Sequence, residues 1–210
     1  FNINFEIQNL MYSIKVLNKF GYEVIIPSFD NDNLKRPLCC GRTYISYGQL
    51  DKAEEELNRF VNYILVNGYY DMPIVGIEPS CLLTFSDEFK TLRNVKNRDK
   101  LKNKFYLLEE FVLEQINEGN KVSLNKFDQN VLIHGHCHQK SQDRIKGLTG
   151  LLSKLNISNK MIDSSCCGMA GSFGYSSKNY DVSKKMANLS LIPAVNESTD
   201  NDFIVANGTS

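Results

Sequence analysis

Apolar residues recur along this chain in two alternating patterns. A spacing of three or four residues predicts helices over 7–17, 57–65, 105–116, 145–155 and 182–189. Short apolar runs predict strands over 22–26, 73–77, 131–134, 160–163 and 203–206. This alternation predicts an α/β fold in which short, mainly parallel sheets are flanked by helices.

One stretch departs from the alternation. Residues 90–104 are rich in Lys and Arg and lie between a predicted strand and a predicted helix. Charged runs of this kind are usually exposed to water. We therefore expect a solvated connector or an exposed helix face here.

Composition excludes some classes of function. The chain is 42% hydrophobic and 23% charged, with a formal net charge of zero, as in an ordinary globular protein. The chain has no excess of positive charge that would favour a nucleic-acid partner. It also has no apolar run long enough for a transmembrane segment. With no secretory signal visible, we expect a cytoplasmic location, free or peripheral at the inner face of the membrane.

Two short motifs repeat along the chain. Leu38-Cys39-Cys40-Gly41 and Ser165-Cys166-Cys167-Gly168 each follow a predicted helix and strand, and each precedes another helix and strand. The repeat predicts two related halves, residues 1–115 and 116–210. The strand after the first motif leads into Cys81, whereas the matching strand leads into Ser210. We therefore expect the second half to be truncated, with a cysteine following in the native chain.

The cysteines are the main candidates for chemistry, because disulfides are uncommon in cytosolic proteins. Neighbouring cysteines suit a cluster of several irons better than one tetrahedral zinc ion. Gly41 and Gly168 have no Cβ, so the backbone can turn tightly and approach a cofactor. The alternatives are small buried residues and a vicinal disulfide. The expected metal ligands are Cys39, Cys40, Cys81, Cys137, Cys166 and Cys167.

All three histidines surround Cys137, at positions 134, 136 and 138. On an extended segment they would share one face, with Cys137 on the other. They are candidates for iron ligands, hydrogen-bond donors around the cofactor, proton relays or solvent-facing loop residues. For each histidine we favour a role beside the cofactor or in a loop over direct ligation of iron, and His136 and His138 are the candidates for cofactor binding. No spacing of Asp or Glu marks a catalytic pair, so the catalytic residues stay unassigned.

Residues 168–174 form a glycine-rich stretch before a predicted helix. Such a stretch can cradle a phosphate, but this one lacks the Lys-Ser/Thr ending of a P-loop. A loop that wraps a cluster is the better interpretation.

Four motifs in order, 39–42, 76–81, 134–140 and 166–175, resemble the C-terminal part of FAD-linked oxidoreductases of the D-lactate and glycolate dehydrogenase type. Those enzymes fuse a flavin domain, a ferredoxin-like cluster domain and a pair of cysteine-rich "CCG" domains. Related domains occur in the cysteine-rich subunits of heterodisulfide reductase and of anaerobic glycerol-3-phosphate dehydrogenase, and in lactate-utilisation proteins.

The resemblance implies part of an enzyme, an oxidoreductase, with an iron–sulfur cluster of 4Fe-4S type here and FAD in another part of the protein. Electrons from a D-2-hydroxy acid would pass from the flavin domain and the ferredoxin-like domain to a quinone or another acceptor. The first half departs from the pattern, because no cysteine precedes Cys39 and Glu78 replaces a cysteine. The second half, with Cys137, is therefore expected to be the stronger cluster site.

Two other functions fit the same cysteines. One is a thiol–disulfide reductase module like heterodisulfide reductase, with a substrate disulfide at the cluster. The other is a zinc-bound structural or docking domain.

Overall fold

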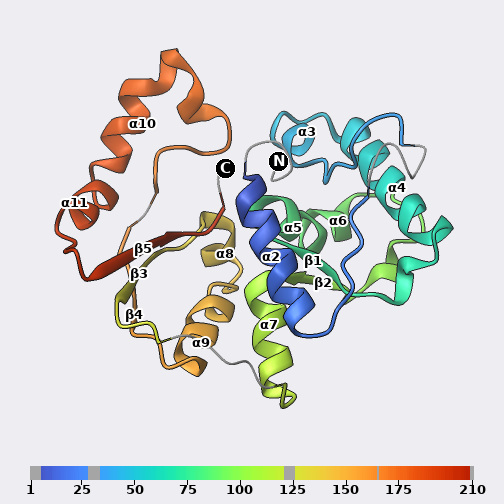
Figure 1. Ribbon diagram of the computed structural model, residues 1–210. Helices are drawn as coiled ribbons and strands as arrows, with labels where there is room; N and C mark the ends of the chain where they lie inside the picture. The colour runs from blue at the N-terminus through green and yellow to red at the C-terminus, as the bar shows by residue number, and fades with distance from the viewer. Residues whose placement is uncertain (1–5, 28–33, 121–125, 165, 209–210) are drawn as a thin grey trace. The chain divides into compact units, whose positions relative to one another are not determined.

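The computed structural model describes residues 6–27, 34–120, 126–164 and 166–208. The chain divides into two compact units, Phe1–Phe111 and Val112–Ser210, and the boundary falls within helix α7. Both units combine helices with a short parallel sheet (Figure 1), which confirms the predicted α/β fold. No helix in the described part of the chain is both long enough and apolar enough to cross a membrane.

The first unit contains a two-stranded parallel sheet, in which Val75 of β1 is in register with Tyr106 of β2. Its elements are α2 (Ile7–Lys19), α3 (Arg42–Ser46), α4 (Leu50–Val66), η1 (Tyr69–Asp71), β1 (Ile74–Gly76), α5 (Pro79–Ser86), α6 (Glu88–Thr91), η2 (Arg98–Leu101), β2 (Phe105–Leu107) and the start of α7 (Leu108–Asn117).

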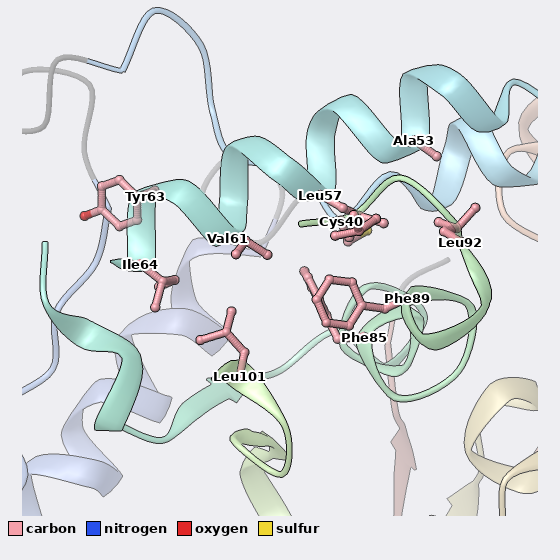
Figure 2. Close-up of a cluster of buried hydrophobic side chains, with 11 residues drawn as sticks. Cys40, Ala53, Leu57, Val61, Tyr63, Ile64, Phe85, Phe89, Leu92 and Leu101 are labelled. Atoms are coloured by element: carbon pink, nitrogen blue, oxygen red, sulfur yellow. The ribbon is translucent and has the colours of Figure 1, made fainter. Parts of the chain in front are cut away.

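Helix α4 supplies one side of the core of this unit. Its buried apolar residues follow at intervals of four, four and three, so they line one stripe: Ala53, Leu57, Val61 and Ile64. Figure 2 shows this stripe facing Phe85 and Phe89. Phe85 also stacks on Phe105, with ring centroids 4.5 Å apart. Helices α4 and α5 and strand β2 therefore share one core.

The charged stretch 90–104 is not a solvated connector, so that expectation is wrong. Three of its apolar side chains are buried, and Leu101 has no exposed surface. The Glu54 carboxylate accepts hydrogen bonds from the backbone N–H and the side-chain amide of Asn94, at 3.0 and 2.8 Å. Asn58 accepts from the N–H of Lys96 at 2.8 Å. Most of the charged side chains are exposed, while apolar residues and hydrogen bonds dock the stretch on α4.

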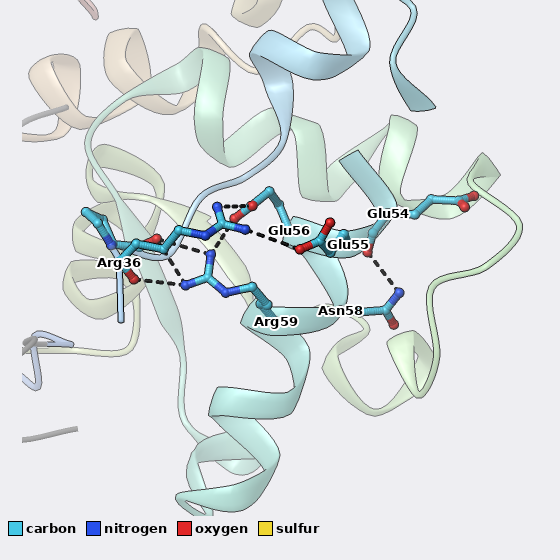
Figure 3. A network of polar contacts seen from close by, with 7 residues as sticks. Arg36, Glu54, Glu55, Glu56, Asn58 and Arg59 are labelled. Atoms are coloured by element: carbon cyan, nitrogen blue, oxygen red, sulfur yellow. Dashed lines mark hydrogen bonds and ion pairs between the residues drawn. The ribbon is translucent and has the colours of Figure 1, made fainter. Parts of the chain in front are cut away.

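A second polar network holds the segment that leads into Cys39. Glu56 is buried in α4 and pairs with the guanidinium groups of Arg36 and Arg59 (Figure 3). Arg59 also donates to the carbonyl of Arg36 at 2.9 Å. A buried carboxylate needs such partners, because desolvation without them is costly. The network fixes residues 36–37 against α4, two residues before Cys39.

Two element predictions in this unit are wrong. Tyr22–Ile26 joins no sheet among the described residues, although its composition is that of a strand. Phe105 begins strand β2 rather than a helix, and α7 starts at Leu108. The N–H of Leu107 donates to the Glu110 carboxylate at 3.0 Å, which fixes this change from strand to helix.

The second unit contains a three-stranded parallel sheet in the order β4-β3-β5. Central strand β3 buries Val131 and Ile133. The elements after α7 are β3 (Asn130–His134), α8 (Cys137–Ser141), α9 (Lys146–Lys154), β4 (Asn159–Met161), η3 (Phe173–Tyr175), η4 (Ser177–Asn179), α10 (Tyr180–Ala187), α11 (Leu191–Asn196) and β5 (Asp202–Ala206).

Parallel strands place their carboxyl ends at one edge of the sheet, where open α/β folds bind ligands. Cys137 follows β3, the pair Cys166 and Cys167 follows β4, and Asn207 follows β5. The N–H of Asn207 donates to the carbonyl of His134 at 3.4 Å, so the hydrogen bonding between β3 and β5 continues to this edge. The topology thus brings the cysteine segments of this unit together. Ser165, Thr209 and Ser210 of the repeated motifs lie outside the described residues.

Candidate functional site

The two Cys-Cys-Gly loops fold in the same way. Gly41 and Gly168 both adopt a left-handed backbone, with φ of 76° and 85°. The N–H of Gly41 donates to Cys39 Sγ at 3.4 Å, and the N–H of Gly168 donates to Cys166 Sγ at 3.3 Å. Each loop therefore turns its backbone amide onto its own first sulfur.

Each loop also lies tightly against a helix that comes later in the same unit. A Cβ at position 41 would lie 3.1 Å from the carbonyl oxygen of Ala53 in α4. A Cβ at position 168 would lie 2.2 Å from the carbonyl oxygen of Ser183 in α10. Glycine is required at both positions by the backbone angle and by the close approach.

In the first unit, three thiols form one connected group. Cys40 has an exposed fraction of 8% and lies in the hydrophobic core (Figure 2), whereas Cys39 and Cys81 are partly buried. The Cys40 thiol is hydrogen-bonded to both of the others. All six cysteines of the chain are free thiols. Cys40 is thus both a core residue and the centre of a thiol trio.

Contacts among these thiols and their burial shift the pKa of each. The hydrogen bond with Cys40, together with burial, raises the pKa of Cys39. The bond with Cys39 lowers the pKa of Cys40, but the bond with Cys81 and burial raise it to about 12. The bond with Cys40 lowers the pKa of Cys81 despite burial. Of these three thiols, Cys81 is the one whose pKa is lowered.

Glu78 stands where the related pattern has a cysteine, and it acts as a helix cap. Its buried carboxylate accepts from the hydroxyl of Ser80 at 2.7 Å and from the N–H of Ser80 at 3.3 Å. A side-chain acceptor at this position stabilises the start of α5. The cap holds the turn that presents Cys81.

In the second unit, Cys137 reaches solvent at the start of α8, and Cys166 and Cys167 are partly buried. Desolvation raises the pKa of Cys137, and the charges of Cys167 and Cys166 raise it further. The three sulfurs are therefore close enough to interact electrostatically, at the carboxyl edge of the sheet.

The sulfurs of the described residues are not arranged around a single metal ion. Among the residues that the structure describes, no group of three His, Cys, Asp or Glu side chains is placed to hold one metal ion. A cluster contains several irons, so its thiolates need not meet at one point. Each unit offers thiols, an amide N–H directed at sulfur and a glycine whose lack of a Cβ lets the loop lie close against a helix. This donor set fits an iron–sulfur cluster.

The extended backbone expected for all of residues 134–138 is not observed. The chain is extended only as far as His136, and α8 begins at Cys137. His136 is buried and caps α8, because its Nδ1 accepts from the N–H of His138 at 3.2 Å. The His136 and His138 rings stack with centroids 5.4 Å apart. These two histidines shape the turn that carries Cys137.

His134 lies beside the second Cys-Cys-Gly loop. Its Nδ1 is 2.8 Å from the hydroxyl of Ser164, two residues before Cys166. Desolvation lowers the pKa of His134, and the charges of Lys140 and His136 lower it further. Lys140 donates to the Ser164 carbonyl at 2.6 Å. His134 and Lys140 therefore connect the segment after β3 to the segment after β4.

Two cations at the site, Lys140 and Arg42, have no role that the sequence pattern predicts. Arg42 follows Gly41 directly and donates through Nε to the carbonyl of Ser80 at 3.2 Å. Its guanidinium also forms a two-pronged ion pair with Glu88. The position of each cation beside a cysteine motif was the one signal in the sequence that could have pointed to these residues. The carbonyl groups that they bind, those of Ser80 and Ser164, cannot be predicted from the sequence.

The second unit is similar to a known family of domains. The profile of the cysteine-rich domain (CCG) family matches residues 131–209. The chain is 28% identical over 173 residues to the C subunit of the anaerobic glycerol-3-phosphate dehydrogenase of Escherichia coli, covering 81% of this chain and 42% of that protein. It is 23% identical over 184 residues to the D-2-hydroxyglutarate dehydrogenase of Pantoea ananatis, covering 86% of this chain and 16% of that protein.

An uncharacterized iron–sulfur protein of Methanococcus maripaludis is 24% identical over 174 residues, which cover 80% of this chain and 31% of that protein. The chain thus spans less than half the length of each of these relatives. No solved structure shows significant similarity to it. The match of residues 131–209 to the cysteine-rich domain (CCG) profile, together with these relatives, confirms the resemblance predicted from the four ordered motifs.

Proposed function

We propose that this chain is an iron–sulfur electron-transfer segment of a larger oxidoreductase, an FAD-linked dehydrogenase of D-2-hydroxy acids. The observation that carries the proposal is the doubled loop, in which a backbone amide donates to the first sulfur of each Cys-Cys-Gly motif. Amide donors stabilise the negative charge of thiolates and raise the potential of iron–sulfur centres.

The residues divide into two proposed centres. Cys137, Cys166 and Cys167 would hold the main cluster, of 4Fe-4S type, and Cys39, Cys40 and Cys81 the second. When bound, such a cluster accepts and releases electrons one at a time. The chain's own residues hold the sulfurs in place, with Gly41 and Gly168 closing the loops and His136 and His138 shaping the turn before the main site. Residues 1–115 and 116–210 would be the two CCG halves.

The names of the relatives support this class of function. One is a subunit of anaerobic glycerol-3-phosphate dehydrogenase, one a D-2-hydroxyglutarate dehydrogenase and one an iron–sulfur protein. We propose that electrons reach this chain from a flavin domain and a ferredoxin-like domain of the same protein or complex. They would leave for a quinone at the inner face of the membrane or for another acceptor in the cytoplasm.

Anaerobic reconstitution of the full-length protein with iron and sulfide tests the proposal. We expect the protein to bind more iron than a ferredoxin-like domain alone would hold. We also expect an EPR signal that the Cys167→Ser substitution removes. Ser190→Ala in the same unit is the matched control, and it should leave the signal unchanged. A folded protein whose iron content and EPR signal do not change in Cys167→Ser would refute the main site.

A second candidate function is thiol–disulfide reduction. It is favoured by the three hydrogen-bonded thiols of the first unit, since reduction of a disulfide needs neighbouring thiols. In that case, added thiol substrate would change the EPR signal of the reconstituted protein. An unchanged signal together with electron transfer to a quinone would favour the first function. Stoichiometric zinc without visible absorbance would instead indicate a zinc-bound docking domain.

A further inference from the structure

Arg42 connects the two cysteine-bearing segments of the first unit. It is the first residue of α3 and follows the Cys39-Cys40-Gly41 loop directly. Its Nε donates to the carbonyl of Ser80, 3.2 Å away and adjacent to Cys81 in the chain. Its terminal nitrogens donate to both carboxylate oxygens of Glu88, one of them at 2.8 Å. One side chain thus spans from one cysteine loop to the other.

The partners of Arg42 are themselves held in place. Ser80 is hydrogen-bonded to the capping carboxylate of Glu78, and the carbonyl of Ser80 also accepts from the hydroxyl of Thr84 at 2.9 Å. Glu88 begins α6, which packs against α5. Arg42 therefore binds a fixed surface, the start of α5 together with the start of α6.

Burial makes this contact stronger than an ordinary surface ion pair. The side chains of Arg42 and Glu88 are only 15% and 26% exposed. A partly desolvated guanidinium that donates to both oxygens of a carboxylate holds its geometry well. Lysine carries the same charge but does not reproduce the planar fork.

The second unit offers an internal contrast. Met169 stands at the position after Gly168, where the first loop has Arg42. A thioether has no donor, so Met169 does not reproduce the three donations of Arg42. The two loops share their amide-to-sulfur bonds, but the arginine contact belongs to the first unit.

We infer that Arg42 is a positioning residue that holds the Cys39-Cys40 loop against the start of α5, so that Cys40 and Cys81 face one shared binding site. The inference rests on the proposed function only for the statement that the shared ligand is an iron–sulfur cluster. The positioning itself is a property of the metal-free chain, and it is tested separately.

The first test uses phenylarsine oxide on the metal-free protein. Its arsenic bonds to two neighbouring thiols, and its oxygen leaves with their two protons as water. The test is done in a Cys39→Ser protein, so that Cys40 and Cys81 are the two cysteines that remain in the first unit. We expect peptide mass spectrometry to find these two joined through arsenic. Adding Arg42→Lys should slow this joining by about tenfold, the effect of losing one charge-assisted hydrogen bond.

Arg98→Lys is the matched control in the same background. Arg98 donates to the carbonyls of Phe89 and Leu92 but touches neither cysteine loop. It should leave the rate within about twofold of the background. Equal rates in the Arg42→Lys and Arg98→Lys proteins would overturn the inference, as would joining of the two thiols in none of the proteins. Near-identical circular dichroism spectra show that both variants fold.

The second test measures iron. In the reconstituted full-length protein, Arg42→Lys should lower iron bound by the first unit and leave the EPR signal that depends on Cys167. Glu88→Gln should have a similar but smaller effect, because a neutral amide still accepts from Arg42. If the first unit of the wild-type protein binds no iron, the proposed second cluster is wrong, while the arsenic result still decides the role of Arg42. If iron binds equally in wild type and Arg42→Lys, Arg42 does not position the cluster ligands.

Discussion

Gly168 lies directly against Ser183 of α10, so that a Cβ at position 168 would lie 2.2 Å from the Ser183 carbonyl oxygen. The matching contact of Gly41 with the Ala53 carbonyl is looser, at 3.1 Å. The loop of the second unit therefore has less room for a side chain at its glycine than the loop of the first unit. Since both glycines have positive φ, replacement by alanine also strains the backbone.

Gly168→Ala should destabilise the protein more than Gly41→Ala. Backbone strain costs each variant roughly 1–2 kcal/mol. At position 168 a backbone oxygen must also move, which adds to that cost and displaces the loop of Cys166. Urea unfolding followed by circular dichroism measures the free energy of unfolding of each variant. Gly171→Ala is the control, since its Cβ would meet nothing within 4 Å; a Gly168→Ala protein as stable as Gly171→Ala would contradict the prediction.

Leu101→Ala tests the docking of the charged stretch 90–104. Leu101 has no exposed surface and belongs to the core of the first unit (Figure 2). Truncation of a buried leucine leaves a cavity and should cost about 2–5 kcal/mol of the free energy of unfolding. Lys102→Ala, at an exposed neighbour, should change it by less than about 0.5 kcal/mol. Similar small effects in both variants would mean that this stretch is solvated after all.

The sequence pattern predicts elements well where the signal is local. The spacing of Leu57, Val61 and Ile64 predicts the buried stripe of helix α4, and a short apolar run predicts strand β3. It fails at Tyr22–Ile26, because a strand also requires a partner that the local sequence does not show. It fails at residues 90–104 because the many charges conceal apolar residues whose burial depends on α4.

The candidate site shows the same division between local and distant information. The repeated Cys-Cys-Gly motif is enough to place Gly41 and Gly168 in equivalent tight loops. The contact of Arg42 with Ser80 joins residues 38 positions apart, and no periodicity predicts it. The extended conformation expected through His138 ends at His136 because a helix begins at Cys137, which changes the side-chain period from two to 3.6.

Glu54 should make the first unit sensitive to acid. Hydrogen bonds from the backbone and side chain of Asn94 lower the pKa of Glu54 below its ordinary value of 4.5. A carboxyl group with a lower pKa in the folded state stabilises the protein fully above its unfolded pKa, and this contribution is lost as the pH falls through the folded pKa. Glu54→Gln should therefore cost stability at neutral pH and cost less as the solution is acidified below about pH 4.

Urea unfolding at a series of pH values measures this effect. The control is Glu55→Gln, because Glu55 is exposed at the neighbouring position and pairs with the half-exposed Arg36 (Figure 3). Its cost should be small at every pH, as expected of a surface ion pair. A difference between wild type and Glu54→Gln that does not change with pH would show that the Asn94 contact does not depend on the charge of Glu54.

The six thiols should react with an alkylating reagent in an order set by exposure and acidity. Cys137 reaches solvent, whereas Cys40 is buried and its pKa is raised to about 12. Only the thiolate reacts, so the raised pKa of Cys40 leaves very little of it ionised at neutral pH. Iodoacetamide labelling of the metal-free protein, quenched at intervals and mapped by mass spectrometry, should find Cys137 modified well before Cys40. Within the first unit, Cys81 should react before Cys39, because contact with Cys40 lowers the pKa of Cys81 and raises that of Cys39. Labelling of Cys39 ahead of Cys81 would contradict this order of acidity.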